Sequence, residues 1–393
     1  MSRRSFLAAL PVLVLSGGLL ACTDRPPSRD ALASPSAGVS VGRSFGPLVA
    51  GMPTYPAAGN VYAAAGPNQL APQVRGDRPL VYVPNTKSND VWVIDPATYQ
   101  VVDKFPGGPE PQHVVPSYDL RTLYVASSQI PNGGLVPIDA RTGKPGAFRK
   151  LDDVYNLYFT PDGKQAIVVA EAYQRLDFYD LKTWQRVRSA RFPECGGINH
   201  MDYTADGKTM LFSCEFANRM LVLDTTSLRK LREFRLTETT DGMPQDTRLT
   251  PDGQHFLVAD MHAHGVYVFD AQATRQTGFI PTGRGAHGIY FNRQATLAYI
   301  TNRDEGTITV LDLTTLKPTT TWRIPGTASP DMGGLSPDGK QLWLSGRYHD
   351  EVYVLNTETG KLLARIPVGR GPHGLTIWPQ PGRYSLGHTG NIR

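Results

Sequence analysis

The amino-acid sequence predicts an all-β protein built as a seven-bladed β-propeller. A short alternating apolar segment that ends in Asp or Asn recurs seven times, and its closing residues lie 41 to 46 residues apart. Turns of the Pro-Asp-Gly type recur between these segments, and no stretch repeats apolar residues with the 3.6-residue period of a helix. Four short antiparallel strands in each unit of about 40–45 residues are typical of a propeller blade. The closing residues are Asp95, Asp139, Asp180, Asp224, Asp270, Asp312 and Asn356.

The first 45 residues are expected to target and tether the protein. Residues 1–21 combine Arg3 and Arg4 with an apolar run and small residues, as a signal peptide does. The arginine pair resembles the twin-arginine export motif, although signals for general secretion also carry basic pairs. Leu19-Leu20-Ala21-Cys22 resembles a bacterial lipobox, which implies that Cys22 is lipidated and anchors the protein in a bilayer. Residues 22–45 are rich in Pro, Ser and Ala and predict a flexible tether. The expected location is the bacterial cell envelope, periplasmic or otherwise extracytoplasmic.

The net charge limits the expected binding partners, and the cysteine content predicts a disulfide. The net charge is +5 over 393 residues, and lysine and arginine are scattered. Phosphate binding needs clustered cations, so nucleic acid is excluded as an expected partner. If Cys22 carries lipid, Cys195 and Cys214 remain, and an oxidising compartment favours a disulfide between them over two buried thiols.

Residues 46–79 are predicted to be irregular and residues 80–393 to form the propeller. The first unit, from about Leu80, lacks a first strand, whereas the chain ends with an unaccompanied one at 373–378. Joining the two gives seven complete blades and leaves no open sheet edge. An eighth, degenerate blade made from residues 46–78 and 383–393 is the alternative.

Two segments resemble a known repeat. Val81-Tyr82-Val83-Pro84-Asn85 and Ala298-Tyr299-Ile300-Thr301-Asn302 are similar to the Tyr-Val-Thr-Asn signature of YVTN repeats. The resemblance to YncE-like seven-bladed propellers covers roughly residues 80–380. The wider superfamily includes the haem domain of cytochrome nitrite reductase, nitrous oxide reductase, and lactonases of sugar-acid metabolism. Since the signature residues are structural, the resemblance implies a fold and leaves the chemistry open.

Polar residues gather where a propeller usually binds ligands, at the starts of the innermost strands and in the loops between second and third strands. The strand starts carry His113, Asn156, His200, Asp246, His287, Asp331 and His373. The loops add Glu171, Glu215, His262, His264, Arg347 and His349. Counted from the following turn, the first four strand residues are one position out of register with the last three. A one-residue difference reverses side-chain direction, so the expected ring is imperfect.

These residues allow three functions. Histidine is the commonest metal ligand, and His262 and His264 could present two imidazoles on one side of an extended segment. No Gly-x-Ser-x-Gly, His-Glu-x-x-His or Cys-x-x-Cys-His motif is present. The sequence therefore favours a monomeric, non-catalytic propeller whose polar channel face binds a small molecule or an envelope protein. One alternative is a redox protein with a metal or haem on the histidine-rich face. Another is a lactonase-like hydrolase using a metal with Glu171, Glu215 and Asp246.

Overall fold

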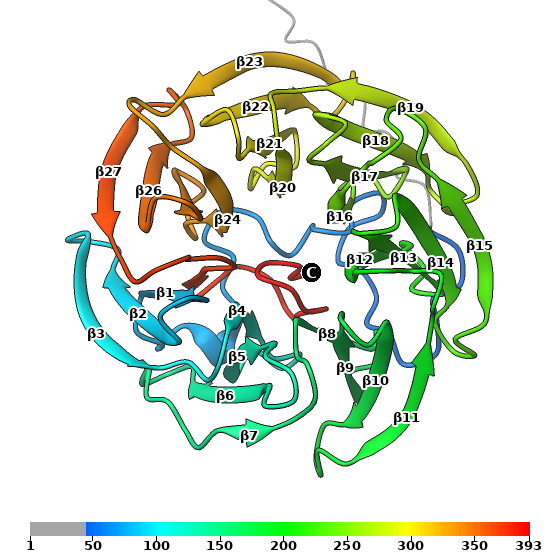
Figure 1. Cartoon of the computed structure of the whole chain (residues 1–393), viewed down its shortest axis with the longest axis horizontal. Coiled ribbons are helices and arrows are strands. Elements are labelled where there is room, and N and C mark those ends of the chain that lie inside the picture. The colour runs from blue at the N-terminus through cyan, green and yellow to red at the C-terminus, as the bar shows by residue number, and fades with distance from the viewer. Residues whose placement is uncertain (1–44) are drawn as a thin grey trace, which may run out of the picture. The chain divides into compact units, whose positions relative to one another are not determined.

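The computed structural model describes residues 45–393, which form a ring of seven four-stranded antiparallel sheets (Figure 1). The predicted seven-bladed propeller is confirmed, and the only helix in these residues is the short 3-10 helix η1 (Pro72–Val74). The predicted signal peptide, Cys22 and almost all of the tether lie outside the described residues.

Each blade is one sheet. The blades are numbered along the chain, and the strands of each blade are given from the innermost to the outermost. Blade 1 contains β28 (Thr376–Trp378), β1 (Leu80–Asn85), β2 (Asp90–Asp95) and β3 (Gln100–Pro106). Blade 2 contains β4 (Pro111–Pro116), β5 (Thr122–Ser127), β6 (Gly134–Asp139) and β7 (Arg149–Lys150). Blade 3 contains β8 (Asn156–Phe159), β9 (Gln165–Ala170), β10 (Arg175–Asp180) and β11 (Arg186–Arg191). Blade 4 contains β12 (Ile198–Tyr203), β13 (Thr209–Cys214), β14 (Arg219–Asp224) and β15 (Lys230–Arg235).

The last three blades follow the same order. Blade 5 contains β16 (Pro244–Leu249), β17 (His255–Asp260), β18 (Gly265–Asp270) and β19 (Gln276–Pro281). Blade 6 contains β20 (Ala286–Phe291), β21 (Leu297–Asn302), β22 (Thr307–Asp312) and β23 (Lys317–Arg323). Blade 7 contains β24 (Pro330–Leu335), β25 (Gln341–Gly346), β26 (Glu351–Asn356) and β27 (Leu362–Pro367).

The ring is closed in blade 1, where the two ends of the propeller pair. Strand β28 from the C-terminal part of the chain lies antiparallel to β1, with Val81 opposite Ile377. This pairing supplies the first strand that the first unit lacks, and it removes the edge that β1 would otherwise expose.

The repeated Asp or Asn makes the turn between the third and fourth strands. The Asp180 carboxylate accepts hydrogen bonds from the backbone N–H groups of Lys182 (3.0 Å) and Thr183 (2.9 Å), and the Asn356 side chain does the same in its own turn. A side chain that replaces missing backbone partners in a tight turn explains why Asp or Asn recurs at this position. Between the first and second strands, Gly163 has φ +67°, the conformation expected for the last residue of the Pro-Asp-Gly turn.

Burial follows the position of a strand in its blade. Every residue of β4 and β24 is buried, whereas outer strands such as β23 are mostly exposed. Apolar clusters lie between adjacent blades; for example, Tyr299 of blade 6 shares a cluster with Leu344 and Tyr353 of blade 7. Each fully buried large apolar side chain contributes roughly 1.5–3 kcal/mol, so the ring is stabilised by its inter-blade contacts.

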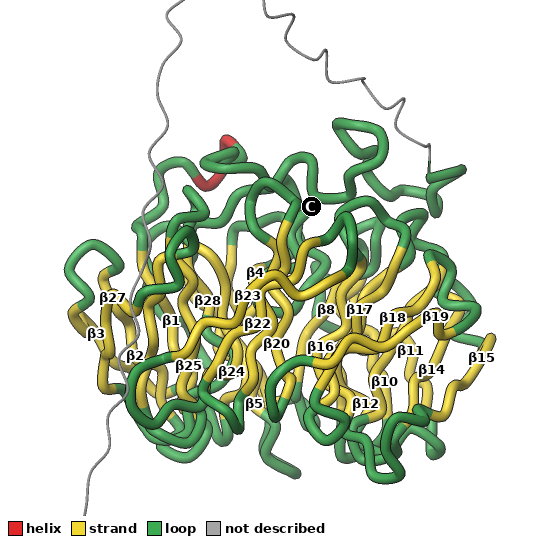
Figure 2. Tube along the Cα trace, turned by 90° about the horizontal axis from the view of Figure 1, so that it is seen from above, coloured by secondary structure: helices red, strands yellow, loops and turns green. Residues whose placement is uncertain are grey.

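Residues 45–79 run along the face that carries the turns between first and second strands, called here the turn face. Backbone N–H groups of Val49, Val61 and Asn68 donate to carbonyl groups in the turns of blades 4, 5 and 7, each at 2.8 Å. Figure 2 shows η1 and the C-terminus on this same side of the ring.

The C-terminal residues 383–393, called here the tail, enter the centre of the ring (Figure 1). Ser385 pairs with Ile392, and Gly387 pairs with Tyr158 of the inner strand β8. Residues 45–393 contain seven sheets, so the tail and the N-terminal segment fill and cover the channel without forming an eighth blade. No helix among the described residues has the length and apolar character needed to cross a membrane.

Candidate functional site

All seven polar residues at the inner-strand starts are buried around the channel. Their exposed fractions are between 0 and 2%. The sequence pattern divided these residues into two groups whose side chains were expected to point in opposite directions. The structure brings the two groups together, because the rings of His113 from one group and His373 from the other have centroids 4.7 Å apart. The reason is a β-bulge at the start of each of five inner strands, such as the register shift between Ile198 and Met201. A bulge inserts residues into one strand, so a count from the turn does not predict which side chains face the channel.

The tail adds a residue that the strand pattern did not predict. His388 is 1% exposed, and its ring lies 4.7 Å from that of His200 and 5.2 Å from that of His113. Its Nε2 atom is 3.3 Å from the Asp246 carboxylate, and its Nδ1 atom is 3.2 Å from the Asn156 amide nitrogen. The sequence feature that could have indicated His388 is the unusually polar composition of Ser385–Asn391, which follows the last apolar strand.

On the other side of the channel, the Asp331 carboxylate contacts an arginine and two histidines. Its carboxylate accepts hydrogen bonds from Arg303 Nε (3.0 Å) and from His373 Nδ1 (2.7 Å), and it lies 3.0 Å from His287 Nδ1. Burial opposes ionisation of Asp331, yet the Arg303 guanidinium and the two imidazoles hold its pKa well below its usual range. The sequence pattern did not single out Arg303, although it directly follows β21 and so has the same loop position as Glu215 after β13 and Arg347 after β25.

Burial lowers the pKa of several channel histidines. It lowers the pKa of His113 and His200 well below the usual 6.5, and the surrounding imidazoles lower both further. Burial and the Arg347 charge lower the pKa of His373 to about 3. The channel therefore presents several uncharged imidazoles packed against one another.

At the channel mouth, on the face opposite the turn face, two carboxylates meet. The Asn199 amide nitrogen donates to Glu171 (3.3 Å) and to Glu215, so one amide binds both. Burial and the Glu215 carboxylate raise the pKa of Glu171 well above its ordinary value. Glu171, Glu215 and Arg347 were all predicted at this face, and Arg347 lowers the pKa of Glu171 through its charge. Within residues 45–393, no cation lies within ion-pair distance of either glutamate.

A cleft of about 400 Å³ opens beside Glu215. The loops of blades 4 and 5 form it, and it includes the side chains of Phe216, Arg219 and Arg235. Phe216 is 66% exposed, which is unusual for a phenylalanine and gives the cleft an aromatic wall. Asp246, grouped with the glutamates for a lactonase-like site, lies deeper in the channel against His388.

The other loop residues have local partners. His262 Nδ1 is 2.7 Å from the Asp241 carbonyl oxygen, and His264 Nδ1 is 2.6 Å from the Met261 carbonyl oxygen. The one group of three possible metal ligands within residues 45–393 lies elsewhere, so a metal site on His262 and His264 stays a prediction without a third ligand. His349 Nδ1 lies 2.9 Å from the Ser329 hydroxyl.

A disulfide joins Cys195 to Cys214, with Cα atoms 4.8 Å apart. Cys195 precedes the strand that carries Asn199 and His200, and Glu215 follows Cys214 directly. The bond therefore ties together two segments that supply the channel and its mouth.

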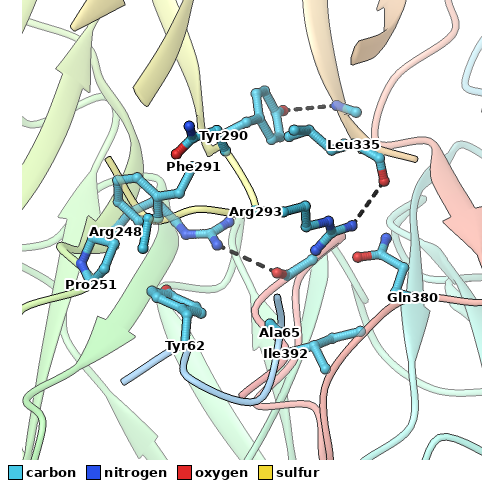
Figure 3. A pocket seen from close by; sticks show the side chains of 15 residues that line it. Tyr62, Ala65, Arg248, Pro251, Tyr290, Phe291, Arg293, Leu335, Gln380 and Ile392 are labelled. Atoms are coloured by element: carbon cyan, nitrogen blue, oxygen red, sulfur yellow. Dashed lines mark hydrogen bonds between the residues drawn. The ribbon is translucent and has the colours of Figure 1, made fainter. Parts of the chain in front are cut away.

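The turn-face end of the channel is narrow. A cavity of about 50 Å³ remains there (Figure 3), bordered by Tyr62 from the N-terminal segment and by Gln380. Arg248 and Arg293 reach into it and donate to the backbone carbonyl oxygens of Gly390 (3.4 Å) and Leu335 (2.9 Å). A volume of this size suits a few water molecules and is too small for an organic ligand.

The channel does not fit the haem that some relatives of the fold contain. The rings of His113, His200, His373 and His388 are in direct contact, with centroids 4.7 to 5.4 Å apart. No space is left between them for a flat macrocycle, and cores packed at this density do not open without cost.

Asp153 positions the loop that carries Glu171, because its carboxylate accepts hydrogen bonds from the backbone N–H of Ala172 (2.8 Å) and Tyr173 (3.4 Å). Burial raises its pKa to about 6 from 3.8. The folded protein therefore keeps this proton between about pH 4 and pH 6, and the associated stability, about 3 kcal/mol, is lost as pH rises through that window. We expect Asp153→Asn, which retains an acceptor oxygen, to gain stability relative to the wild type at pH 7 and not at pH 4. Urea unfolding at both pH values checks this, and an equal difference at both would contradict it.

Comparison with known proteins agrees with this architecture. Residues 58–381 match the family described as YNCE-like beta-propeller. The hydrazine synthase subunit beta of Kuenenia stuttgartiensis is 23% identical over 241 residues, which cover 54% of this chain and 57% of that protein, so the chain spans little more than half of this relative.

Two solved structures share the fold at lower identity. A functionally unknown protein from Desulfotomaculum acetoxidans DSM 771 has a TM-score of 0.65 at 16% identity, covering 76% of this chain and 98% of that one. The dihydro-heme d1 dehydrogenase NirN in complex with DHE has a TM-score of 0.57 at 16% identity and covers 82% of each chain. At these identities the likeness concerns the fold alone, whereas the family match covers most of the chain. The chain belongs to the YncE-like β-propeller family.

Proposed function

We propose that this protein is an envelope lipoprotein, anchored through Cys22, that binds a small organic cation at its channel mouth. The observation that carries the proposal is the pair Glu171 and Glu215, which share one amide donor and have no cation of residues 45–393 within ion-pair distance. Two crowded carboxylates favour a ligand that brings positive charge and hydrogen-bond donors.

The cleft beside Glu215 supports an organic ligand over a bare ion. Its volume of about 400 Å³ lies within the range of small-molecule sites. Exposed Phe216 offers an aromatic surface next to the carboxylates, and an aromatic face attracts both apolar groups and cations. The proposed ligand class is therefore an amine with an apolar or aromatic portion.

Matched probes test the charge. Benzylamine and phenylacetate share a ring and differ in the sign of their charge, so calorimetry with the full-length protein should detect benzylamine and not phenylacetate. Glu215→Gln should weaken benzylamine binding about tenfold, the effect of losing a charged hydrogen bond of about 1.5 kcal/mol. Glu358→Gln, at an exposed turn residue on the opposite face, should leave it unchanged.

Equal binding of the two probes, or a Glu215→Gln variant that binds as the wild type does, would contradict the cation-binding proposal. The anchor is tested separately: Cys22→Ser should move the protein from the membrane fraction to the soluble fraction.

A further inference from the structure

Three imidazoles meet on the channel axis from three distant parts of the sequence. His113 belongs to β4, His200 to β12, and His388 to the tail. One ring nitrogen of each lies within 4.8 Å of one ring nitrogen of each of the others. Their exposed fractions are 0%, 0% and 1%, so bulk water does not reach them. The fold thus brings together a buried cluster of good metal ligands.

Several of these nitrogens lack a protein partner. Within residues 45–393, neither nitrogen of His113 has a hydrogen-bond partner, and Nε2 of His200 has none. A buried polar atom without a partner costs about 1–3 kcal/mol, and native interiors contain few of them. Unpaired nitrogens at the centre of a packed channel indicate a partner that the protein itself does not supply.

Neighbouring side chains orient the cluster as outer residues orient metal ligands. The Asp246 carboxylate lies 3.3 Å from Nε2 of His388. The Asn156 amide nitrogen, a hydrogen-bond donor, lies 3.2 Å from Nδ1 of His200 and 3.2 Å from Nδ1 of His388 and holds both ring planes. A carboxylate that accepts a hydrogen bond from the second ring nitrogen fixes the orientation of a ligating histidine and raises its basicity, and Asp246 is placed to do this for His388.

We propose that His113, His200 and His388 together bind one divalent transition-metal ion of the zinc type. Nitrogen atoms around a tetrahedral zinc ion are about 3.3 Å apart, so small side-chain rotations would bring the three onto one ion. Three imidazole ligands suit zinc, copper or nickel and disfavour calcium and magnesium, which prefer oxygen. Three protein ligands leave a coordination position for water or another molecule.

This site is independent of the cation site at the mouth. Its ligands are the buried imidazoles, whereas the mouth uses Glu171 and Glu215. The metal proposal can therefore fail while benzylamine binding persists, and the reverse also holds.

Metal binding to the full-length protein provides the test. After removal of metal with dipicolinate, zinc titration followed by calorimetry and elemental analysis should show one equivalent bound. His113→Ala and His388→Ala should each weaken zinc binding at least a hundredfold, and Asp246→Asn about ten- to a hundredfold. Cobalt substitution should give visible absorption bands of a tetrahedral site, which the His113→Ala variant should lose.

The double variant His262→Ala with His264→Ala is the matched control, since it removes two histidines outside the cluster and should keep full occupancy. Zinc that stays bound to His113→Ala, or is lost from the control alone, would overturn the assignment. A wild type that binds no zinc or cobalt at micromolar concentration would overturn it as well. Asp246→Asn keeps the test valid if an alanine variant does not fold.

Discussion

Replacing Arg393 with methionine is expected to lower the free energy of unfolding by about 3–5 kcal/mol. Arg393 and Asp202 are 1% and 0% exposed, and Nη2 of the arginine donates to the aspartate at 2.7 Å. Arg393 also donates to the Tyr55 hydroxyl at 2.9 Å, which links the tail to the N-terminal segment. Removing the guanidinium leaves the Asp202 charge buried without its cation, and that is the costly part of breaking a buried pair.

Urea unfolding followed by tryptophan fluorescence measures this loss. Arg383→Met is the matched control, because Arg383 lies in the same tail and is exposed, and its side chain donates to the Thr54 carbonyl oxygen. The control should lose no more than about 0.5 kcal/mol. Adding Asp202→Asn to Arg393→Met should recover part of the stability, because it removes the orphaned charge. A loss below about 1 kcal/mol in Arg393→Met would show that the remaining donors to Asp202 suffice.

Removing the disulfide is the second change with a large expected effect. Cys195 and Cys214 are 19 residues apart, and a bond closing a loop of that length contributes about 3 kcal/mol by restricting the unfolded chain. The double variant Cys195→Ser with Cys214→Ser should lose about that amount in urea unfolding. Reductant should destabilise the wild type similarly and leave the variant unaffected.

The disulfide also bears on the site, because it joins the segments that carry Asn199 and Glu215. We therefore expect the double variant to bind benzylamine more weakly at temperatures where it is still folded. A variant as stable as the wild type under oxidising conditions would refute the stabilising role.

The fold could be predicted because each blade repeats the same local rules. Asp180 or Asn356 closes a turn with its own side chain, and Gly163 takes a positive φ, so these residues recur wherever the same turn recurs. The pairing of β1 with β28 was predictable from the number of strands, since the first unit lacked a first strand and the chain ended with an unpaired one.

Part of the site was also predictable from position. His113, His200 and Asp331 lie near the starts of inner strands, His373 lies just before β28, and inner strands of a propeller must face the channel. Arg303 has the same position after β21 that Arg347 has after β25, so the pattern could have included it, but its pairing with Asp331 of the next blade is decided only by the tertiary structure.

The sequence by itself determined the seven-bladed ring and the polar residues near the starts of its inner strands, because both depend on local repeats and strand positions. The tertiary structure alone decided which imidazoles touch. Bulges at the strand starts overrode the register count, and the tail placed His388 against both His113 and His200. Both outcomes arise from packing between segments far apart in the chain, about which the local pattern of residues carries no information.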